Sequence, residues 1–158
     1  MTDFAGEPRR RIALVGLARF GIAEPYAGGL ECHVADLGRQ LQAIGHEVTV
    51  YAGPATAPKP ADLSVVPIIE REPDMSGYAR IDNSNPPGRA EAEEIGYHRT
   101  LDLIASSSYD VVHNASLHPV PVLRGDSLSV PVLHALHSPP FPDLERAHRA
   151  RAHRSNHR

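Results

Sequence analysis

Two glycines stand where a long loop meets the start of a helical pattern. Gly28 and Gly29 follow a loop over residues 17–27, and Glu31 falls in the first turn of the helix that the later apolar spacing predicts. Glycines in this position let backbone N–H groups approach a ligand, and a helix N-terminus favours a phosphate or a developing negative charge. Paired glycines are also common in plain turns. Two interpretations therefore stay open, an anion-binding backbone and an ordinary turn.

Polar residues also follow two of the predicted strands. His113 ends the apolar pattern of residues 109–114, and His137 and Ser138 come directly after the pattern of residues 131–136. Ligands of open α/β sheets bind beyond the carboxyl ends of the strands. An imidazole there can orient hydroxyl groups or take part in proton transfer. These residues predict a site at one sheet edge, with a satisfied loop histidine as the alternative for each ring.

The chain contains ten histidines, so a metal site has to be considered. His113, His134 and His137 could converge from neighbouring strands, but no group of Asp, Glu, His and Cys has zinc spacing, and Cys32 falls on the predicted helix. We therefore expect no metal ion. His134 is expected to be a core or interface residue hydrogen-bonded to the backbone, and His118 an ordinary loop residue.

Two well-known phosphate loops do not fit the first glycines. Gly16 and Gly21 stand five apart, but Ile22-Ala23 replaces the Lys-Ser/Thr pair that a P-loop needs. The dinucleotide fingerprint fails because Gly16 is followed by Leu17-Ala18-Arg19, without its second glycine. No cofactor is expected, and an NAD-binding epimerase or dehydrogenase fragment is retained only as an alternative.

The elements that must position these residues alternate between strand and helix. A strand over residues 12–15, a helix over 29–45 and a strand over 47–51 make a right-handed βαβ unit. The later pattern predicts strands over 63–69, 109–114 and 131–136, a helix over 90–107 and a short, proline-limited helix over 117–124. Pro67 places its strand at a sheet edge or ends it. The predicted fold is α/β, a Rossmann-like, mainly parallel sheet with flanking helices.

Both ends of the chain differ in composition from its centre. Residues 1–10 are expected to be a disordered lead-in, residues 70–89 a long excursion or mobile lid, and residues 143–158 a low-complexity Arg/His/Ala tail. The tail has one large apolar side chain and is expected to make no core element, at most a solvated helix that frays. Its five arginines could touch phosphate or an acidic membrane surface.

The whole chain of 158 residues has a formal net charge of −3, and the part before this basic tail is acidic. This excludes nucleic acid as a partner of the main domain. The single cysteine fits a reducing compartment, and no apolar run is long enough to span a membrane or to form a signal peptide core. A cytoplasmic location is expected.

Five segments in order resemble the start of a family 4 glycosyltransferase of the GT-B fold. They are residues 11–15, 26–31, 34–50, 109–113 and 131–138, and the resemblance covers about residues 11–142. It implies two Rossmann-like domains facing across a cleft, in which the amino-terminal domain mainly binds the acceptor. The carboxyl-terminal domain would bind the nucleotide-sugar donor, and a hexosyl group would be transferred with retention of configuration.

The resemblance also implies roles for single residues. Gly28 and Gly29 would lie near the donor phosphates, His137 would be the catalytic residue beside the reacting sugar, and Glu31, His113 and Ser138 would contact substrate. Nothing after Pro142 resembles the second domain, so we expect a truncated product or fragment that is inactive alone. The alternative functions are a non-catalytic sugar- or phosphate-binding remnant and the NAD-binding fragment named above.

Overall fold

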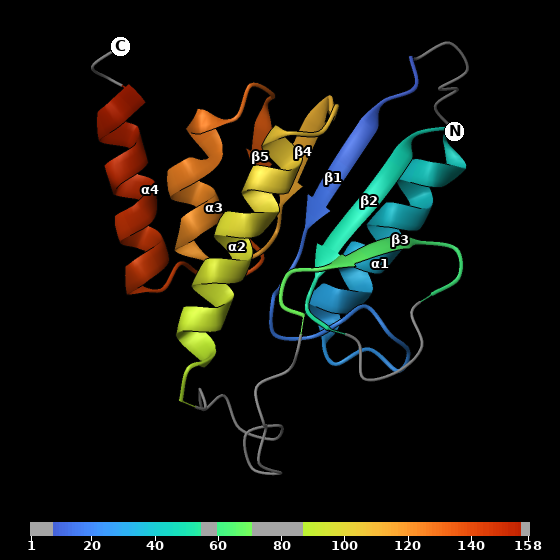
Figure 1. The fold of residues 1–158 in the computed structure, drawn as a ribbon, viewed down its shortest axis with the longest axis horizontal. Helices are drawn as coiled ribbons and strands as arrows, with labels where there is room; N and C mark the ends of the chain where they lie inside the picture. Colours follow the sequence, from blue (N-terminus) through green and yellow to red (C-terminus); the bar gives the residue numbers. More distant parts are fainter. Residues whose placement is uncertain (1–7, 55–59, 71–86, 156–158) are drawn as a thin grey trace.

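The computed structural model describes residues 8–54, 60–70 and 87–155, and the description below refers to these residues. They form an all-parallel five-stranded sheet with helices on both faces (Figure 1). The strands are β1 (Arg11–Val15), β2 (Glu47–Ala52), β3 (Ser64–Pro67), β4 (Val111–Asn114) and β5 (Val132–His134). The helices are α1 (Gly29–Ala43), α2 (Arg89–Ala105), α3 (Pro119–Arg124) and α4 (Pro142–Ser155), with a 3-10 turn over Gly125–Ser127.

The strand order is β3-β2-β1-β4-β5. The chain moves outward from β1 to β3, then returns to place β4 on the other side of β1. The order reverses between β1 and β4, which is where open α/β sheets bind their ligands. The predicted Rossmann-like α/β fold is confirmed.

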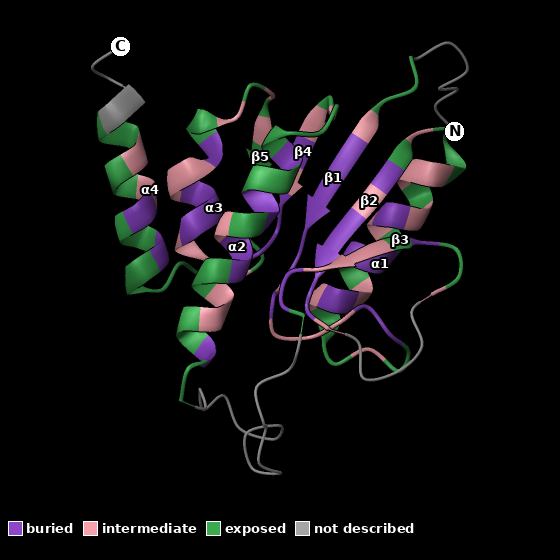
Figure 2. Cartoon of the chain, viewed as in Figure 1, coloured by how far each residue is buried: buried purple, intermediate pink, exposed green. Residues whose placement is uncertain are grey.

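Alternating side chains of the strands build two cores, one on each face of the sheet. On one face Leu14 and Val50 pack with Val34 of α1. On the other face Val15 and Val112 pack with Tyr97 of α2. The central strands are buried on both faces, as their near-continuous apolar runs indicate (Figure 2). The α1 face is less well covered near β5, where Leu133 is 59% exposed.

Several predicted boundaries change in the structure. β3 is an edge strand and ends at Pro67, as expected. The two later strands are shorter than predicted, covering Val111–Asn114 and Val132–His134. Pro119 does not limit α3 but begins it, because the missing N–H of a proline costs nothing at the first helical position.

The prediction that the tail makes no core element is wrong. α4 packs against α3 at the far end of the molecule from α1 (Figure 1), and its Leu144 and Ala147 are 1% and 2% exposed beside Val122. These two side chains are three residues apart and share one helix face. A single large apolar residue and a small one are therefore enough to pack α4 against α3. Arg151 adds an ion pair with Asp126 at 2.9 Å.

Some expectations fall outside the described residues. The structure does not describe most of two predicted segments, the lead-in over residues 1–10 and the excursion over residues 70–89. Among the helices that are described, none has the length and apolar character needed to cross a membrane.

Candidate functional site

Hydrogen bonds from α2 fix the backbone at the start of the loop that follows β1. Tyr97 of α2 is 1% exposed, and its hydroxyl accepts from the N–H of Ala18 at 2.9 Å and donates to the carbonyl of Gly16 at 3.1 Å. Burial raises the pKa of this hydroxyl, so it stays protonated and keeps both roles. Gly53 packs closely against the same turn. A residue with a Cβ would not fit there, because the Cβ would lie 2.4 Å from the carbonyl oxygen of Ala18.

A buried ion pair supports the same turn from α2. Arg89 is fully buried and holds the carboxylate of Glu93 at 2.7 Å, one helical turn away. A second nitrogen of Arg89 donates to the carbonyl of Ala18 at 3.4 Å. The charge of Arg89 is thereby used to fix the backbone at the carboxyl end of β1.

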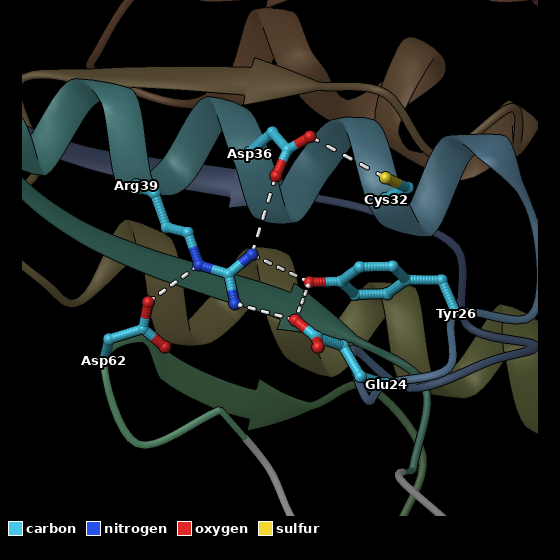
Figure 3. Close-up of polar contacts among 6 residues, drawn as sticks. All are labelled: Glu24, Tyr26, Cys32, Asp36, Arg39 and Asp62. Atoms are coloured by element: carbon cyan, nitrogen blue, oxygen red, sulfur yellow. Dashed lines mark hydrogen bonds and ion pairs between the residues drawn. The ribbon is translucent and has the colours of Figure 1, made fainter.

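The end of this loop is fastened to α1 by one arginine (Figure 3). Arg39 donates to Asp62 at 2.7 Å and to the hydroxyl of Tyr26 at 2.8 Å, and it pairs with Glu24 at 3.4 Å and with Asp36 at 3.5 Å. These partners come from the loop, from α1 itself and from the segment before β3. The planar guanidinium therefore joins three segments and sets where the loop enters α1.

The entry to α1 is built from the two predicted glycines and Glu31. Gly28 is the N-cap, with Gly29 as the first helical residue. Glu31 is 4% exposed, and its carboxylate accepts from its own N–H and from that of Gly28, the reach-back half of a capping box. Burial is the larger effect and raises the pKa of Glu31. One of its oxygens is buried without a hydrogen-bond partner.

Two histidines, His33 and His137, are in ring contact beside this helix end, and His113 interacts with both through its charge. The ring centroids of His33, from α1, and His137, after β5, lie 4.7 Å apart with a tilt of 56°. His113 of β4 faces the same side of the sheet, and its pKa is lowered by burial and then by the charges of His137 and His33. The pKa of His137 is lowered by burial and by His33. We call these three residues the histidine cluster.

A groove lies at the same sheet edge, on the α2 side. Its volume is about 910 Å³, and its lining includes Arg19, Glu94, Ser116, His118 and Phe141. His118 stacks on Tyr97 with centroids 4.4 Å apart. Its Nδ1 accepts from the N–H of Val120 at 3.3 Å, so the proton of the neutral ring lies on Nε2. Burial lowers the pKa of His118 to about 4.

The backbone is strained where it forms this groove. Leu117 has a φ of 55°, in the left-handed region that a bulky side chain rarely adopts. On either side of it, the N–H of Ser116 donates to Asn114 at 3.2 Å and the N–H of His118 donates to Ser116 at 3.3 Å. These bonds hold the polar side chains of the groove in place.

His134 lies on the opposite face from the histidine cluster. Its Nδ1 is 3.0 Å from the side-chain nitrogen of Asn114, and its ring stands edge-on to His148 of α4 at 5.9 Å. It is an interface residue as expected, but its partner is a side chain rather than the backbone. Burial lowers the pKa of His134 to about 4.

Comparison with known proteins decides the family. The family model described as Glycosyltransferase Family 4 matches residues 27–158, most of the chain. The chain belongs to glycosyltransferase family 4. The match of this family 4 domain includes the tail over residues 143–158, in agreement with the packing of α4.

Curated relatives of the family 4 domain are named for inositol phosphate. The chain is 25% identical over 135 residues to D-inositol 3-phosphate glycosyltransferase 2 of Catenulispora acidiphila, and 27% identical over 137 residues to the D-inositol 3-phosphate glycosyltransferase of Jonesia denitrificans. These matches cover 82% and 83% of this chain and 32% of each relative. The chain thus spans about a third of the length of the curated relatives it matches.

The structure brings most of the predicted site residues together. Gly28, Gly29 and Glu31 form the start of α1, and the ring of His137 contacts that of His33 in the same helix. His113 interacts with both rings only through its charge. Ser138 follows His137, and its hydroxyl donates to the carbonyl of Pro139 at 3.3 Å. Sequence reasoning missed His33. Its position four residues after Gly29 was an available signal, since that spacing returns a side chain to the same helix face.

The groove was also missed. Ser116 and His118 follow a predicted strand end, but the contact that assembles them is with Tyr97, far away in the chain. The residues that the structure describes contain no group of three or more His, Cys, Asp and Glu that could hold a metal ion.

Proposed function

We propose that this family 4 domain is the acceptor-side half of a retaining hexosyltransferase. The reaction transfers a hexosyl group from a nucleotide-sugar to an acceptor hydroxyl. The donor is held chiefly by a second domain that lies outside these residues, so the chain alone is inactive. The alternatives, a non-catalytic binding remnant and an NAD-binding fragment, are addressed by the experiments below.

One observation supports this proposal most directly. His137 is exposed at the carboxyl edge of the sheet, and the ring of His33 places it beside the start of α1. An imidazole in this position can orient a sugar hydroxyl or accept its proton. Its lowered pKa keeps it neutral, and therefore able to accept a proton, at neutral pH.

The leaving group also needs stabilisation. When the bond from the sugar to the diphosphate breaks, negative charge grows on the phosphate oxygens. Backbone N–H groups at the start of α1 can stabilise that charge, provided that the glycines allow close approach. A side chain added at Gly28 would lie 3.0 Å from a Glu31 oxygen, so the absence of a Cβ there keeps the turn open.

The groove beside Ser116 is the proposed acceptor site. The groove offers the Nε2–H donor of His118, the carboxylates of Glu94 and Asp143 and the ring of Phe141. These groups suit a hydroxyl-rich acceptor, because hydroxyl groups both donate and accept hydrogen bonds and an aromatic ring packs on a sugar face. The relatives' names make inositol and inositol phosphates the first compounds to test.

A fusion protein tests the reaction. The chain would be joined to the part of the Catenulispora relative that follows the matched region, and hexosyl transfer would be assayed with a nucleotide-sugar panel. We expect product with retained anomeric configuration, and His137→Ala should lower the rate by roughly a hundredfold or more. The same fusion with His153→Ala, an exposed histidine of α4, is the control.

Inverted product would contradict the proposal. Full activity of the His137→Ala fusion would do the same. Transfer by the unfused chain would overturn the part of the proposal that assigns the donor to a second domain.

A further inference from the structure

An apolar furrow runs along the contact between α3 and α4, the two helices that lie side by side in Figure 1. Its volume is about 340 Å³. The furrow is lined by residues of both helices, namely Pro119, Leu123, Asp143, Arg146, Ala147 and Ala150. The residues from α4 span about two helical turns, a length of about 10 Å. The furrow therefore has the length of a medium alkyl chain.

The furrow is continuous with the groove that is the proposed acceptor site. Pro119, Leu123 and Asp143 line both spaces. In the groove, polar groups such as the Nε2–H of His118 lie near the ring of Phe141, which is 42% exposed. Beyond the three shared residues, the furrow continues over alanine side chains of α4. A polar compartment is thus followed by an apolar one.

The two charged side chains of the furrow neutralise each other. Arg146 forms an ion pair with Asp143, three residues earlier on α4, and both side chains are exposed at the rim. Ala147, which is 2% exposed, and the half-buried Leu123 lie between the helices, against the small core of Val122. The paired charges leave no net charge to attract an ion, and the apolar surface favours an uncharged hydrocarbon segment.

We propose that the furrow binds the hydrocarbon chain of an amphiphilic acceptor whose hydroxyl-rich head group lies in the groove. The inference rests on the proposed function, because the groove must hold the acceptor. The acceptor class is then a hydroxylated head group that carries an alkyl or acyl chain. A chain that leaves water for the furrow adds binding free energy in proportion to the apolar area that it buries. A free polyol such as inositol occupies only the groove.

A series of alkyl glucosides tests the furrow in the intact chain. Methyl, butyl, hexyl and octyl glucoside share one head group and differ only in chain length, and each is titrated below the concentration at which it forms micelles. We expect the dissociation constant to fall by about two- to fourfold for each added methylene until the furrow is filled. In nuclear magnetic resonance, octyl glucoside should move the methyl signals of Ala147 and Ala150 together with the imidazole signal of His118. Methyl glucoside should move the His118 signal and leave the two alanine signals in place.

Substitutions in α4 locate the chain. Ala150 lines the furrow and not the groove, so Ala150→Trp should fill the furrow and leave the head-group site open. Octyl glucoside should then bind about tenfold or more weakly, close to the affinity of methyl glucoside. Ala152→Trp is the matched control, at an exposed alanine of the same helix that lines neither space, and should leave the whole series unchanged. Circular dichroism checks that both variants keep their helices.

Octyl glucoside that binds no more tightly than methyl glucoside would overturn the inference. The same holds for an Ala150→Trp chain that keeps the full dependence on chain length, and for octyl-induced shifts confined to Leu133 and Leu136, the exposed leucines in and after β5. Failure of the furrow is distinct from failure of the proposed function. Transfer to inositol by the fusion, without any dependence of binding on chain length, rejects only the furrow. Binding that depends on chain length, without any transfer, rejects only the reaction.

Discussion

The hydroxyl of Tyr97 binds the backbone of Ala18 across the sheet edge. It accepts from the Ala18 N–H at 2.9 Å and lies 79 residues away in the chain. This bond connects α2 to the loop that leads from β1 to α1, so the helix on one face of the sheet fixes the approach to the helix on the other. The start of the site is therefore set by long-range contacts.

Tyr97→Phe tests this connection. The change removes a buried hydroxyl and leaves the Ala18 N–H and the Gly16 carbonyl without their partner, which should cost about 1–3 kcal/mol in the free energy of unfolding. Urea denaturation measures the loss. Tyr109→Phe is the control, because its hydroxyl meets that of Tyr51 at 3.0 Å at a more exposed place and should cost less. Equal losses in the two variants would contradict this role for Tyr97.

Arg39→Lys tests the fastening of the loop end. An ammonium group cannot hold Asp62 and Tyr26 in the planar arrangement of a guanidinium, so the loop before Gly28 should open more often. We expect several-fold faster amide exchange over residues 24–28, measured by hydrogen exchange, with little change in β1. Arg149→Lys, on the exposed face of α4, is the control. Unchanged exchange in the loop would show that Arg39 does not hold it.

Two half-buried histidines, His118 and His134, predict a loss of stability in acid. Burial lowers the pKa of His118 and of His134 to about 4, below the value near 6.5 of an unfolded chain. The unfolded state therefore binds more protons between these values, and stability that is complete above pH 6.5 declines as the pH falls toward 4. Melting temperatures across this range measure the decline.

Variants identify the histidine responsible. His134→Asn should flatten the dependence on pH, whereas His153→Asn, at an exposed site, should leave it unchanged. A melting temperature that is constant from neutral pH to the acid end of the range would contradict the assignment.

Leu144→Ala tests whether α4 belongs to the folded domain. Leu144 is 1% exposed against Val122 and anchors a helix with few other apolar residues. Removing a buried leucine side chain should lower the free energy of unfolding by about 2–3 kcal/mol. Denaturation followed by circular dichroism gives this value, with Arg149→Ala as the surface control. A loss no greater than that of the control would show that α4 adds nothing to the core.

The fold could be predicted from sequence because its signals are local. The apolar run of residues 12–15 and the helical spacing after Gly29 each indicate an element without knowledge of its neighbours. The prediction that the tail over residues 143–158 makes no core element rests on composition alone. Composition does not show that Leu144 and Ala147 lie on one helix face toward Val122. Its packing therefore needed the structure.

The candidate site was predictable only in part. Ligands of open α/β sheets bind beyond the carboxyl ends of the strands, and this principle led to His113 and His137 because it depends only on where the strands end. In the structure His113 lies in β4 and His137 follows β5. His33 joins them through a contact between α1 and the segment after β5, more than 100 residues apart in the chain, and the groove of Ser116 depends on Tyr97. The spacing of His33 from Gly29 indicates the helix face that His33 occupies, but no local sequence signal shows which distant residue either of these side chains contacts.

We propose that this chain is the acceptor-side half of a family 4 transferase whose donor is held chiefly by a second domain. Calorimetric titration of the isolated chain with nucleotide-sugars and with NAD tests that claim most directly. The proposal predicts dissociation constants of about 1 mM or weaker for every one of them. Binding of any nucleotide-sugar or of NAD at about 10 μM or tighter would contradict it.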